Sequence, residues 1–491
     1  MPHHASFLDD GAVPLVDEHT WNDLDMDAVC ARIDRTVSIP GRMALRRMLR
    51  SAVPSTEALA ERDALIGALA PARENARALR GELTLLDRTA GAEDLASLLW
   101  EHPPEGLPHG WAYRLLALLA IASVVLALSV GGRMVFVPVL VFALNTALHY
   151  RIRVRWQVEI QALRFVGRLR ACAHKVVSIP EPLLDRHQRR LSTTLNDTAS
   201  VARRVTLLST GDIWGVLYEY VNIFFLLELQ AYEWLVRHWP RATPGLREIF
   251  LTVGELDAVA SVGQWRADSP TWCRPDLEPG PARLELTDGV HPLLDDPVPS
   301  SLSLTGRGCL ITGANMSGKS TLLRTLGINA LFAQTIFTCP ARQYRASPLG
   351  IISSMRVGDD ILAGRSHYLA EAERLLALIR KGDSGEPTLC LIDELLSGTN
   401  AAERLAASRA ILDYLADRGL LVVAATHDLD LTESLRDRYE SYFFADDFSR
   451  DDLRFDYRLR PGVVTTRNAV RLLERLGYPK EIIARAREDR Q

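Results

Sequence analysis

Residues 313–320, G-A-N-M-S-G-K-S, fit the phosphate-binding pattern G-x-x-x-x-G-K-[ST]. In this pattern the glycines let backbone N–H groups surround the phosphates, the lysine reaches the β- and γ-phosphates, and the final hydroxyl ligates Mg²⁺. The apolar run 309–311 predicts the strand that enters the loop, and residues from Thr321 onward predict a helix whose N-terminus faces the phosphates. We expect ATP to be bound by Gly313, Asn315, Ser317, Gly318, Lys319, Ser320 and Thr321.

Two adjacent acids follow a second apolar run. Residues 389–392, L-C-L-I, predict a buried parallel strand, and Asp393 and Glu394 stand at its carboxyl end, where sheets of this class bind ligands. We expect Asp393 to join Ser320 in holding Mg²⁺ and Glu394 to polarise the attacking water. Surface acids often end a strand, but two of them downstream of a phosphate-binding loop favour the chemical interpretation.

A third apolar run, 420–425, ends in Thr426-His427. A lone histidine after a strand is more often a loop or core residue. In this setting we favour a catalytic role in which His427 senses the γ-phosphate, beside Lys319 and Glu394. The stretch 397–400, S-G-T-N, is by itself an ordinary turn.

Residues 310–321 resemble the phosphate-binding loop of the MutS mismatch-repair ATPases, with Ala314 where that family usually has Pro and Ser317 where it has Gly. Further segments resemble the family in order: 356–360, 364–366, 393–399, 425–427 and 462–487. The resemblance implies a P-loop NTPase of the ABC/MutS type over 280–491, a homodimer joined through the C-terminal helices, and a serine, Ser366, that reaches the partner's nucleotide.

A weaker resemblance extends upstream. Residues 36–49 look like the start of the MutS helical core, or lever, and the segments 256–257, 273–275 and 289–292 look like its exit into the ATPase. A generic amphipathic helix is the alternative for the first segment. Because core-like helices begin near residue 20, we expect neither a mismatch-reading domain with its Phe-x-Glu wedge nor a connector domain. No aromatic that would stack on adenine is evident at 296–299, D-P-V-P.

The composition is that of a globular protein with several domains. The chain has 491 residues, of which 47% are hydrophobic and 24% charged, and its net charge of −4 does not indicate nucleic-acid binding by the whole chain. The six cysteines form no C-x-x-C pair, so we expect no zinc site and no disulfide framework. The N-terminus resembles no cleaved signal, and we expect the nucleotide site to face the cytosol.

Two uncharged apolar runs, 115–130 and 134–148, flank Gly131-Gly132-Arg133. Each is slightly short for a hydrocarbon layer of about 30 Å, but aromatic residues extend the first and an arginine-rich belt, 151–156, follows the second. Core helices normally carry a polar stripe, which these runs lack. We therefore predict a transmembrane helical hairpin at 111–150, with both ends in the cytosol, and keep a buried hairpin as the alternative.

These segments define the expected organisation. The chain would comprise a lead-in (1–20), a first helical core part (20–100), the hairpin (111–150), a second core part (151–265) punctuated by Pro240 and Pro244, and the α/β ATPase with its dimerisation helices (280–491). The apolar region 213–229 contains regularly spaced polar residues and predicts a core helix of the lever.

Two functions fit. The first is a membrane-anchored, MutS-like ATPase that uses ATP-driven motion of a dimer on a membrane-proximal target without reading mismatches. The second is a DNA-binding repair or recombination ATPase whose hairpin is buried or serves as a tether. An ABC transporter is a weaker third, because the Leu-Ser-Gly-Gly-Gln signature is absent ahead of Asp393 and two apolar runs are too few for a permeation path.

Overall fold

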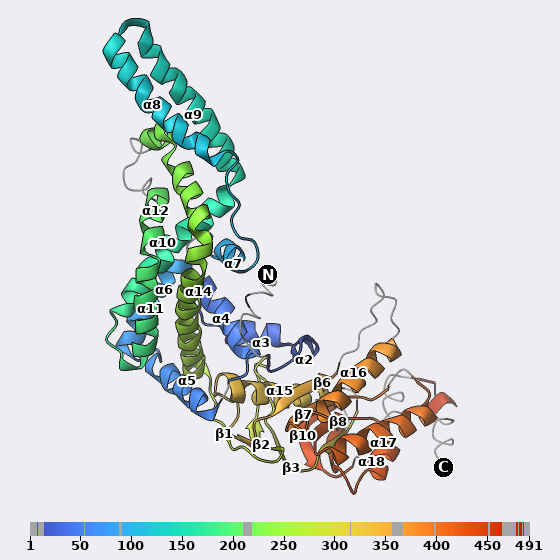
Figure 1. Cartoon of the computed structure of the whole chain (residues 1–491). Helices are drawn as coiled ribbons and strands as arrows, with labels where there is room; N and C mark the ends of the chain where they lie inside the picture. Colours follow the sequence, from blue (N-terminus) through green and yellow to red (C-terminus); the bar gives the residue numbers. More distant parts are fainter. Residues whose placement is uncertain are drawn as a thin grey trace. The chain divides into compact units, whose positions relative to one another are not determined.

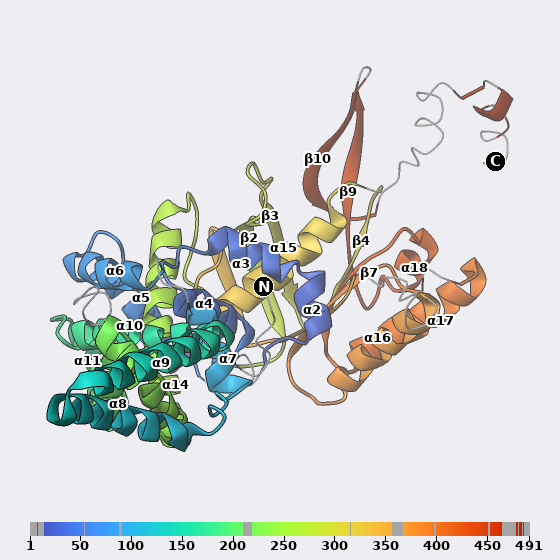
Figure 2. The same cartoon turned by 90° about the horizontal axis from the view of Figure 1, so that it is seen from above.

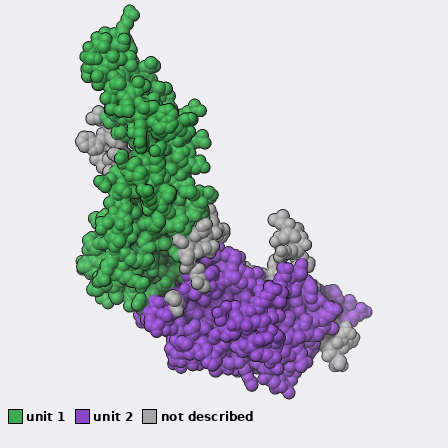
Figure 3. Space-filling view, viewed as in Figure 1, with its two compact units in different colours: residues 1–13, 34–48, 61–267 green, residues 14–33, 49–60, 268–491 purple. Residues whose placement is uncertain are grey.

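The computed structural model separates into two compact units, shown in green and purple in Figure 3. Unit 1 comprises residues 1–13, 34–48 and 61–267, and unit 2 comprises 14–33, 49–60 and 268–491. The structure describes residues 7, 14–53, 55–87, 91–209, 219–314, 316–355, 367–396, 399–449, 452–463, 478–479, 481–483 and 485.

Unit 2 contains a six-stranded sheet in the order β10-β9-β4-β8-β7-β6. The five strands from β9 to β6 are parallel, and β10 pairs antiparallel to β9 in the long ribbon seen in Figure 2. The strands are β4 (Cys309–Thr312), β6 (Gly350–Ser354), β7 (Thr388–Asp393), β8 (Leu421–Ala425), β9 (Glu440–Ser449) and β10 (Asp452–Pro461). Strand β8 therefore lies between β4 and β7, although it follows both in the sequence.

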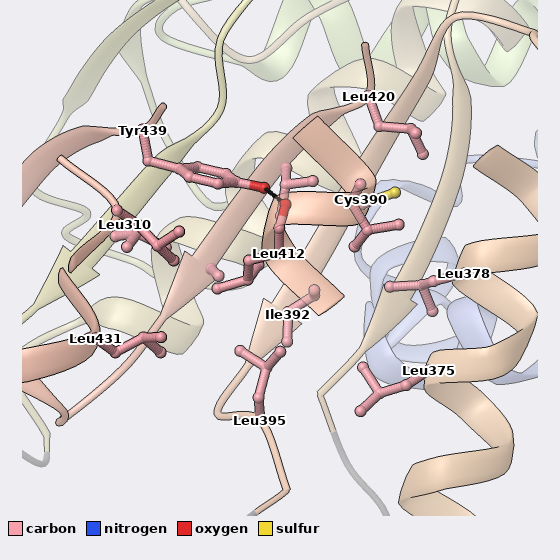
Figure 4. Packing of buried hydrophobic residues seen from close by; sticks show 14 of the residues in the cluster. Leu310, Leu375, Leu378, Cys390, Ile392, Leu395, Leu412, Leu420, Leu431 and Tyr439 are labelled. Atoms are coloured by element: carbon pink, nitrogen blue, oxygen red, sulfur yellow. Dashed lines mark hydrogen bonds between the residues drawn. The ribbon is translucent and has the colours of Figure 1, made fainter. Parts of the chain in front are cut away.

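Helices cover both faces of this sheet, which explains why its central strands are almost wholly apolar. On one face Cys390 and Ile392 of β7 pack with α16 (His367–Gly382) and α17 (Ala401–Asp417), and the Tyr439 hydroxyl donates to the carbonyl oxygen of Leu412 at 2.7 Å (Figure 4). On the other face α15 (Lys319–Thr335) packs against β7. The short helix α18 (Leu429–Ser434) lies on the same face as α16 and α17, where its Leu431 joins their apolar cluster.

A second, four-stranded sheet has the order β1-β5-β2-β3. Its strands are β1 (Asp276–Leu277), β2 (Arg283–Gly289), β3 (Ser300–Thr305) and β5 (Gln343–Ala346). Helix α15, which begins at the phosphate-binding loop, contacts β2 of this sheet as well as the six-stranded sheet. Both sheets therefore help to fix the helix that positions Lys319 and Ser320.

An N-terminal segment belongs to unit 2, beyond the range that the sequence assigned to the ATPase. Helices α2 (Glu18–Asp23) and α3 (Met26–Ile33) follow one another, and α2 packs against the edge strand β6. The Asp23 carboxylate accepts hydrogen bonds from the Ser353 hydroxyl at 2.6 Å and from the Met355 N–H at 3.0 Å, while Arg374 of α16 pairs with Asp17. These buried polar contacts, which no local pattern predicts, attach the segment to the sheet edge.

Unit 1 is helical (Figure 1). In the sequence, the divisions between the two units fall within α4 and α5 and at the end of the long α14. The helices of unit 1 are α4 (Ile39–Arg50), α5 (Thr56–Ala68), α6 (Glu74–Asp87), α7 (Ala92–Trp100), α8 (Gly110–Val130), α9 (Phe136–Arg155), α10 (Gln157–Val177), α11 (Asp185–Asp197), α12 (Ala199–Ser209) and α14 (Leu227–Asp268), with 3₁₀ turns η1 (Gly132–Val135) and η2 (Pro182–Leu184).

Helix α14 runs for 42 residues and continues through Pro240 and Pro244, the two prolines that punctuate the second core part in the sequence. A proline inside a helix costs about 3 kcal/mol because it removes a hydrogen bond and crowds the preceding turn. The helix buries large side chains on both sides of the prolines, among them Tyr232, Leu235, Leu246 and Phe250, and this packing offsets the cost. The region 213–229 is described only from residue 219, and 219–225 is helical.

A buried carboxylate of α14 holds the start of α4. Asp257 accepts hydrogen bonds from the N–H groups of Val37 and Ser38, the latter at 2.9 Å, and from the Ser38 hydroxyl at 2.5 Å. A Cβ on Gly41 would collide with this carboxyl group. Burial nevertheless raises the pKa of Asp257 to about 6.

Helices α8 and α9 lie side by side at one end of unit 1 (Figure 1). Their buried positions form narrow stripes, for example Val141, Asn145, His149 and Ile152 of α9, while the other apolar side chains of both helices are mostly exposed. By length and composition, Gly110–Val130 and Gly132–Arg155 could each cross a membrane. The same test is also passed by core helices of soluble proteins, but these two helices are mostly exposed.

Candidate nucleotide site

The phosphate-binding loop connects β4 to α15, as its pattern predicts. Gly313 and Gly318 have φ angles of 147° and 109°, and Met316 has 68°, so the chain curls through the left-handed region. A Cβ on Gly313 would lie 2.9 Å from the Ser317 Oγ and 3.1 Å from the carbonyl oxygen of Phe444. The glycine is therefore required by space as well as by its backbone angle. Asn315, a predicted ligand, lies outside the described residues.

Lys319 is the first residue of α15 and its side chain is buried. Its Nζ donates to the carbonyl oxygens of Gly313 at 2.9 Å and Ala314 at 2.8 Å. The ammonium group is thus held over the loop at the positive end of the helix dipole. Gly318, the N-cap, has no side chain to occupy the first N–H groups of α15, which leaves this helix end suited to an anion.

Ser320 and Asp393 lie in hydrogen-bond contact. The Ser320 hydroxyl, in the first turn of α15, donates a hydrogen bond to the Asp393 carboxylate at the end of β7. A hydroxyl and a carboxylate oxygen in contact are the kind of donor set that Mg²⁺ takes from a protein, since this ion keeps waters and phosphate oxygens as its other ligands. No cluster of three or more His, Cys, Asp or Glu side chains suited to a metal occurs within the described residues. A site that relies on phosphate oxygens does not need such a cluster.

Glu394, His427 and Lys319 form a second connected group. The His427 Nε2 lies 3.1 Å from the Glu394 Oε1 and 3.3 Å from the Lys319 Nζ. A lysine only donates and an ionised glutamate only accepts, so Nε2 donates to Glu394 when it carries the proton and accepts from Lys319 when it does not, and it makes one of these hydrogen bonds at a time. His427 can therefore exchange one partner for the other. Its hydrogen bond lowers the pKa of Glu394, which keeps this carboxylate ionised.

The backbone at Glu394 explains how its side chain leaves the strand. Its φ of 64° lies in the left-handed region, where a non-glycine residue is strained. The Glu394 N–H donates to the carbonyl oxygen of Ala425 at 3.0 Å, and the Thr426 N–H donates to that of Ile311, also at 3.0 Å. These bonds extend the β7–β8 and β8–β4 ladders just beyond the strand ends and fix the positions of Glu394 and His427.

These side chains line one cavity of about 680 Å³. Its walls also include Thr321, which was a predicted ligand, and Val298 and Ser300 ahead of β4. Ser317 is buried, and its hydroxyl has no hydrogen-bond partner among the described residues. Of the other predicted positions, Ser366, Ser397-Gly398 and most of 462–487 lie outside the described part of the chain.

The sequence analysis missed two aromatic residues of the cavity wall, Phe444 of β9 and Tyr457 of β10. Tyr457 is 44% exposed, has a φ of 53°, and its ring lies 3.4 Å from where a Cβ on Gly318 would stand. The β9–β10 ribbon, far from the segment ahead of β4 in sequence, brings this ring back over the loop. His291 also lines the cavity, and burial, together with the nearby Arg324, lowers its pKa to about 4.

Comparison with known proteins also indicates a relation to the MutS proteins. Residues 309–491 match the family model MutS domain V. The chain is 30% identical over 273 residues to the DNA mismatch repair protein MutS of Natronomonas pharaonis and 32% identical over 252 residues to that of Thermus aquaticus. These matches support membership of the MutS family.

The MutS matches cover only part of each protein. They include 53% of this chain and 31% of the Natronomonas protein, and 50% and 30% for the Thermus protein. A protein named DNA mismatch repair protein MutS 2, from Haloarcula marismortui, is 31% identical over 271 residues, which is 48% of this chain and 28% of that relative. The matched part of the chain thus spans about a third of the length of these curated relatives.

Proposed function

We propose that this chain is an ATPase of the MutS type that binds ATP with Mg²⁺ and hydrolyses it. The observation that carries the proposal is the convergence of Lys319, Ser320, Asp393, Glu394 and His427 in one cavity at the carboxyl ends of β4, β7 and β8. Each of these residue types has a distinct part in phosphoryl transfer to water.

Binding would exchange hydrogen bonds within the loop for bonds to the nucleotide. Lys319 now donates to two loop carbonyls, and phosphate oxygens, which carry more negative charge, are better acceptors for its ammonium group. Ser320 and Asp393 would hold Mg²⁺, which when bound neutralises charge on the phosphates. Tyr457 offers an aromatic face to the base on the same side of the loop.

Glu394 would orient and polarise the attacking water, and His427 would support it. The ionised Glu394 accepts from the His427 Nε2–H, and the same nitrogen lies beside Lys319, the residue that would reach the phosphates. The imidazole thus lies between the group that would act on water and the group that would bind the phosphates, and its Nε2 can hydrogen-bond to one of them at a time.

We further propose a homodimer in which Ser366 of one protomer reaches the nucleotide of the other. The resemblance of 364–366 and 462–487 to MutS segments supports this part. In such a dimer ATP-driven motion would be transmitted through the helices of unit 1.

An ATPase assay of the full chain purified in detergent tests the proposal. The wild type should release phosphate from ATP and Mg²⁺, while Lys319→Ala should neither bind nor hydrolyse ATP. Lys381→Ala is a matched control, because Lys381 lies on the surface in an ion pair with Glu386. A wild type that binds no ATP, or a Lys319→Ala variant with wild-type turnover, would overturn the proposal.

We also propose that α8 and α9 insert into the cytoplasmic membrane, with the nucleotide site in the cytosol. The exposed apolar faces of both helices support this, because water disfavours so large an apolar surface. The chain should remain in the membrane pellet after an alkaline carbonate wash. Recovery in the soluble fraction would instead favour a hairpin that is covered by protein.

The alternative is a DNA-binding repair or recombination ATPase of the MutS family whose hairpin is buried or serves as a tether, and its motivation is that the relatives are DNA mismatch repair proteins. The ATPase assay separates the two functions when it is repeated with added DNA. Stimulation by DNA, together with an affinity for DNA that falls steeply with salt, would support the alternative. Turnover that is independent of DNA would support action on a membrane-proximal target.

A further inference from the structure

Two cysteines that are 66 positions apart in the sequence form an isolated antiparallel bridge in unit 2. The Cys273 N–H donates to the carbonyl oxygen of Cys339 at 2.9 Å, and the Cys339 N–H donates back at the same distance. Both side chains are thiols. Cys273 precedes β1, and Cys339 follows α15, the helix that begins at the phosphate-binding loop.

The backbone pairing sets the distance between the two sulfur-bearing side chains. Opposed residues that exchange both backbone hydrogen bonds have Cα atoms about 5.5 Å apart, and their side chains lie on one face with Cβ atoms about 5.5 Å apart, at the upper end of the cross-strand range. A disulfide has Cα atoms 4.4–6.8 Å apart and needs a Cβ separation of roughly 3.5–4.5 Å. An adjustment on the order of 1 Å would therefore allow the bond.

The two thiols differ in access. Cys273 is half-buried, whereas Cys339 is fully buried and its Sγ lies 3.6 Å from the carbonyl oxygen of Asn329. A hydrogen bond from the Cys339 side chain lowers the pKa of the Cys273 thiol, although burial opposes this. The more accessible thiol is thus also the one favoured as a thiolate, which is the nucleophile in thiol–disulfide exchange.

We propose that Cys273 and Cys339 form a reversible disulfide by exchange with a small-molecule disulfide. The Cys273 thiolate attacks one sulfur of the small disulfide, which forms a mixed disulfide and releases one small thiolate. The Cys339 thiol then loses its proton and attacks the Cys273 sulfur, and the second small thiol leaves. The two protein thiols are oxidised and the small disulfide is reduced to two thiols.

This bond would close a loop that contains the phosphate-binding loop and the whole of α15. It would also tie the end of α15 to the strand segment that follows residue 268, where unit 2 resumes in the sequence. A cross-link over so long a loop restricts the unfolded chain more than the folded one. The oxidised form of unit 2 should therefore resist unfolding better than the reduced form.

The test uses the full chain equilibrated with glutathione disulfide and then digested without reduction. Mass spectrometry of the wild type should find the peptides of Cys273 and Cys339 linked, with two hydrogens lost, and dithiothreitol should release them. Cys30→Ser is a matched control, because Cys30 is also half-buried but lies in helix α3 and not in the Cys273–Cys339 bridge. This variant should still form the link, and Cys273→Ser should not.

Glutathione attached to Cys273 with no internal link would overturn the proposal, as would a link that involves other cysteines. A thermal melt gives a second measurement on the same samples. The oxidised wild type should unfold several degrees above its reduced form, and the difference should vanish in Cys339→Ser. An oxidised form that melts below the reduced one would show that the native fold does not accommodate the bond. Neither measurement depends on ATP hydrolysis.

Discussion

The apolar run of β7 and that of α8 have similar compositions and opposite surroundings. Leu389 and Leu391 of β7 are fully buried between layers of helices, whereas Leu118 and Val125 of α8 are 60% and 59% exposed. Both runs lack charges, so hydropathy does not distinguish them. The difference lies in their partners. A strand in a parallel sheet is covered on both faces, while α8 contacts α9 along a narrow stripe and presents its remaining apolar surface outward.

An uninterrupted apolar run thus indicates that a segment should be shielded from water. It does not indicate whether other parts of the protein or a membrane provide the shielding. For β7 the cover is supplied by the chain itself. For α8 and α9 the described part of the chain covers only a narrow stripe, and we propose that a bilayer covers the rest.

A charged side chain placed in each of the two apolar runs should have the largest effect and should show most clearly whether their surroundings differ. Leu391→Asp would place an unpaired carboxylate in the sheet core and should cost more than about 4 kcal/mol of unfolding free energy, which abolishes ATP binding. The double variant Leu118→Asp/Val125→Asp changes one exposed face of α8 and should leave ATP binding intact. It should, however, shift the protein from the carbonate-washed pellet to the soluble fraction. Loss of ATP binding in the double variant, measured with a fluorescent nucleotide, would show that this face is packed within the protein.

The next largest effect should come from the nucleotide site. Glu394→Gln should bind ATP with wild-type affinity yet turn it over at least about 100-fold more slowly, because the neutral amide cannot polarise the attacking water. Phosphate release and nucleotide binding, measured in parallel, separate the two steps. Glu386→Gln, on the surface near β7, is the control and should behave as the wild type. Unchanged turnover in Glu394→Gln would remove this residue from its assigned role.

His427→Ala should have a smaller effect, a loss of turnover of about tenfold, because it removes a supporting group but leaves the carboxylate. The hydrogen bond from His427 lowers the pKa of Glu394, so its loss should raise that pKa. The acidic limb of the pH–turnover profile should then move to higher pH, since Glu394 must be ionised to act. His102→Ala, at an exposed side chain, should leave the profile in place. A profile that does not move in His427→Ala would contradict the contact.

The last prediction concerns stability and not turnover, in the packed part of unit 1. Burial raises the pKa of Asp257 to about 6 from an ordinary 3.8. Between these two pH values the folded state therefore keeps a proton on Asp257 that the unfolded state has lost. The unfolding free energy should be highest below about pH 4 and should fall by up to about 3 kcal/mol as the pH rises through 6.

Asp257→Asn tests this pH dependence. Its amide oxygen can still accept from the N–H groups that start α4, but it has no charge to titrate. Denaturant unfolding between pH 4 and 7 should show the dependence in the wild type and in Asp185→Asn, whose side chain is exposed, and should show it weakened in Asp257→Asn. An equal slope in all three proteins would show that the carboxyl group of Asp257 does not titrate in this range.

Much of the local structure could be predicted from the sequence. The strands β4, β7 and β8 are short apolar runs that end in polar residues, and the loop between Gly313 and Ser320 has a fixed spacing with one structural solution. The helices α8 and α9 correspond to the two predicted runs. In these places the local pattern and the tertiary surroundings favour the same conformation.

Other features depended on contacts between distant segments. Residues 14–33 join unit 2 because Asp23 and Asp17 find partners on β6 and α16. Tyr457 reaches the cavity on the β9–β10 ribbon, and α14 continues through its prolines because burial offsets their cost. The sequence spacing of Cys273 and Cys339 does not predict that they lie opposite each other, because the backbone bridge that pairs them forms only in the folded chain.

The sequence by itself determined which residues can do the chemistry, because the phosphate-binding loop, the paired acids and the histidine are each encoded by neighbours along the chain. Only the tertiary structure decided how they act together. The strand order places β8 between β4 and β7, so His427 lies 3.3 Å from Lys319 and 3.1 Å from Glu394. Strand order depends on which apolar faces the helices cover across the whole sheet, and no single segment carries that information.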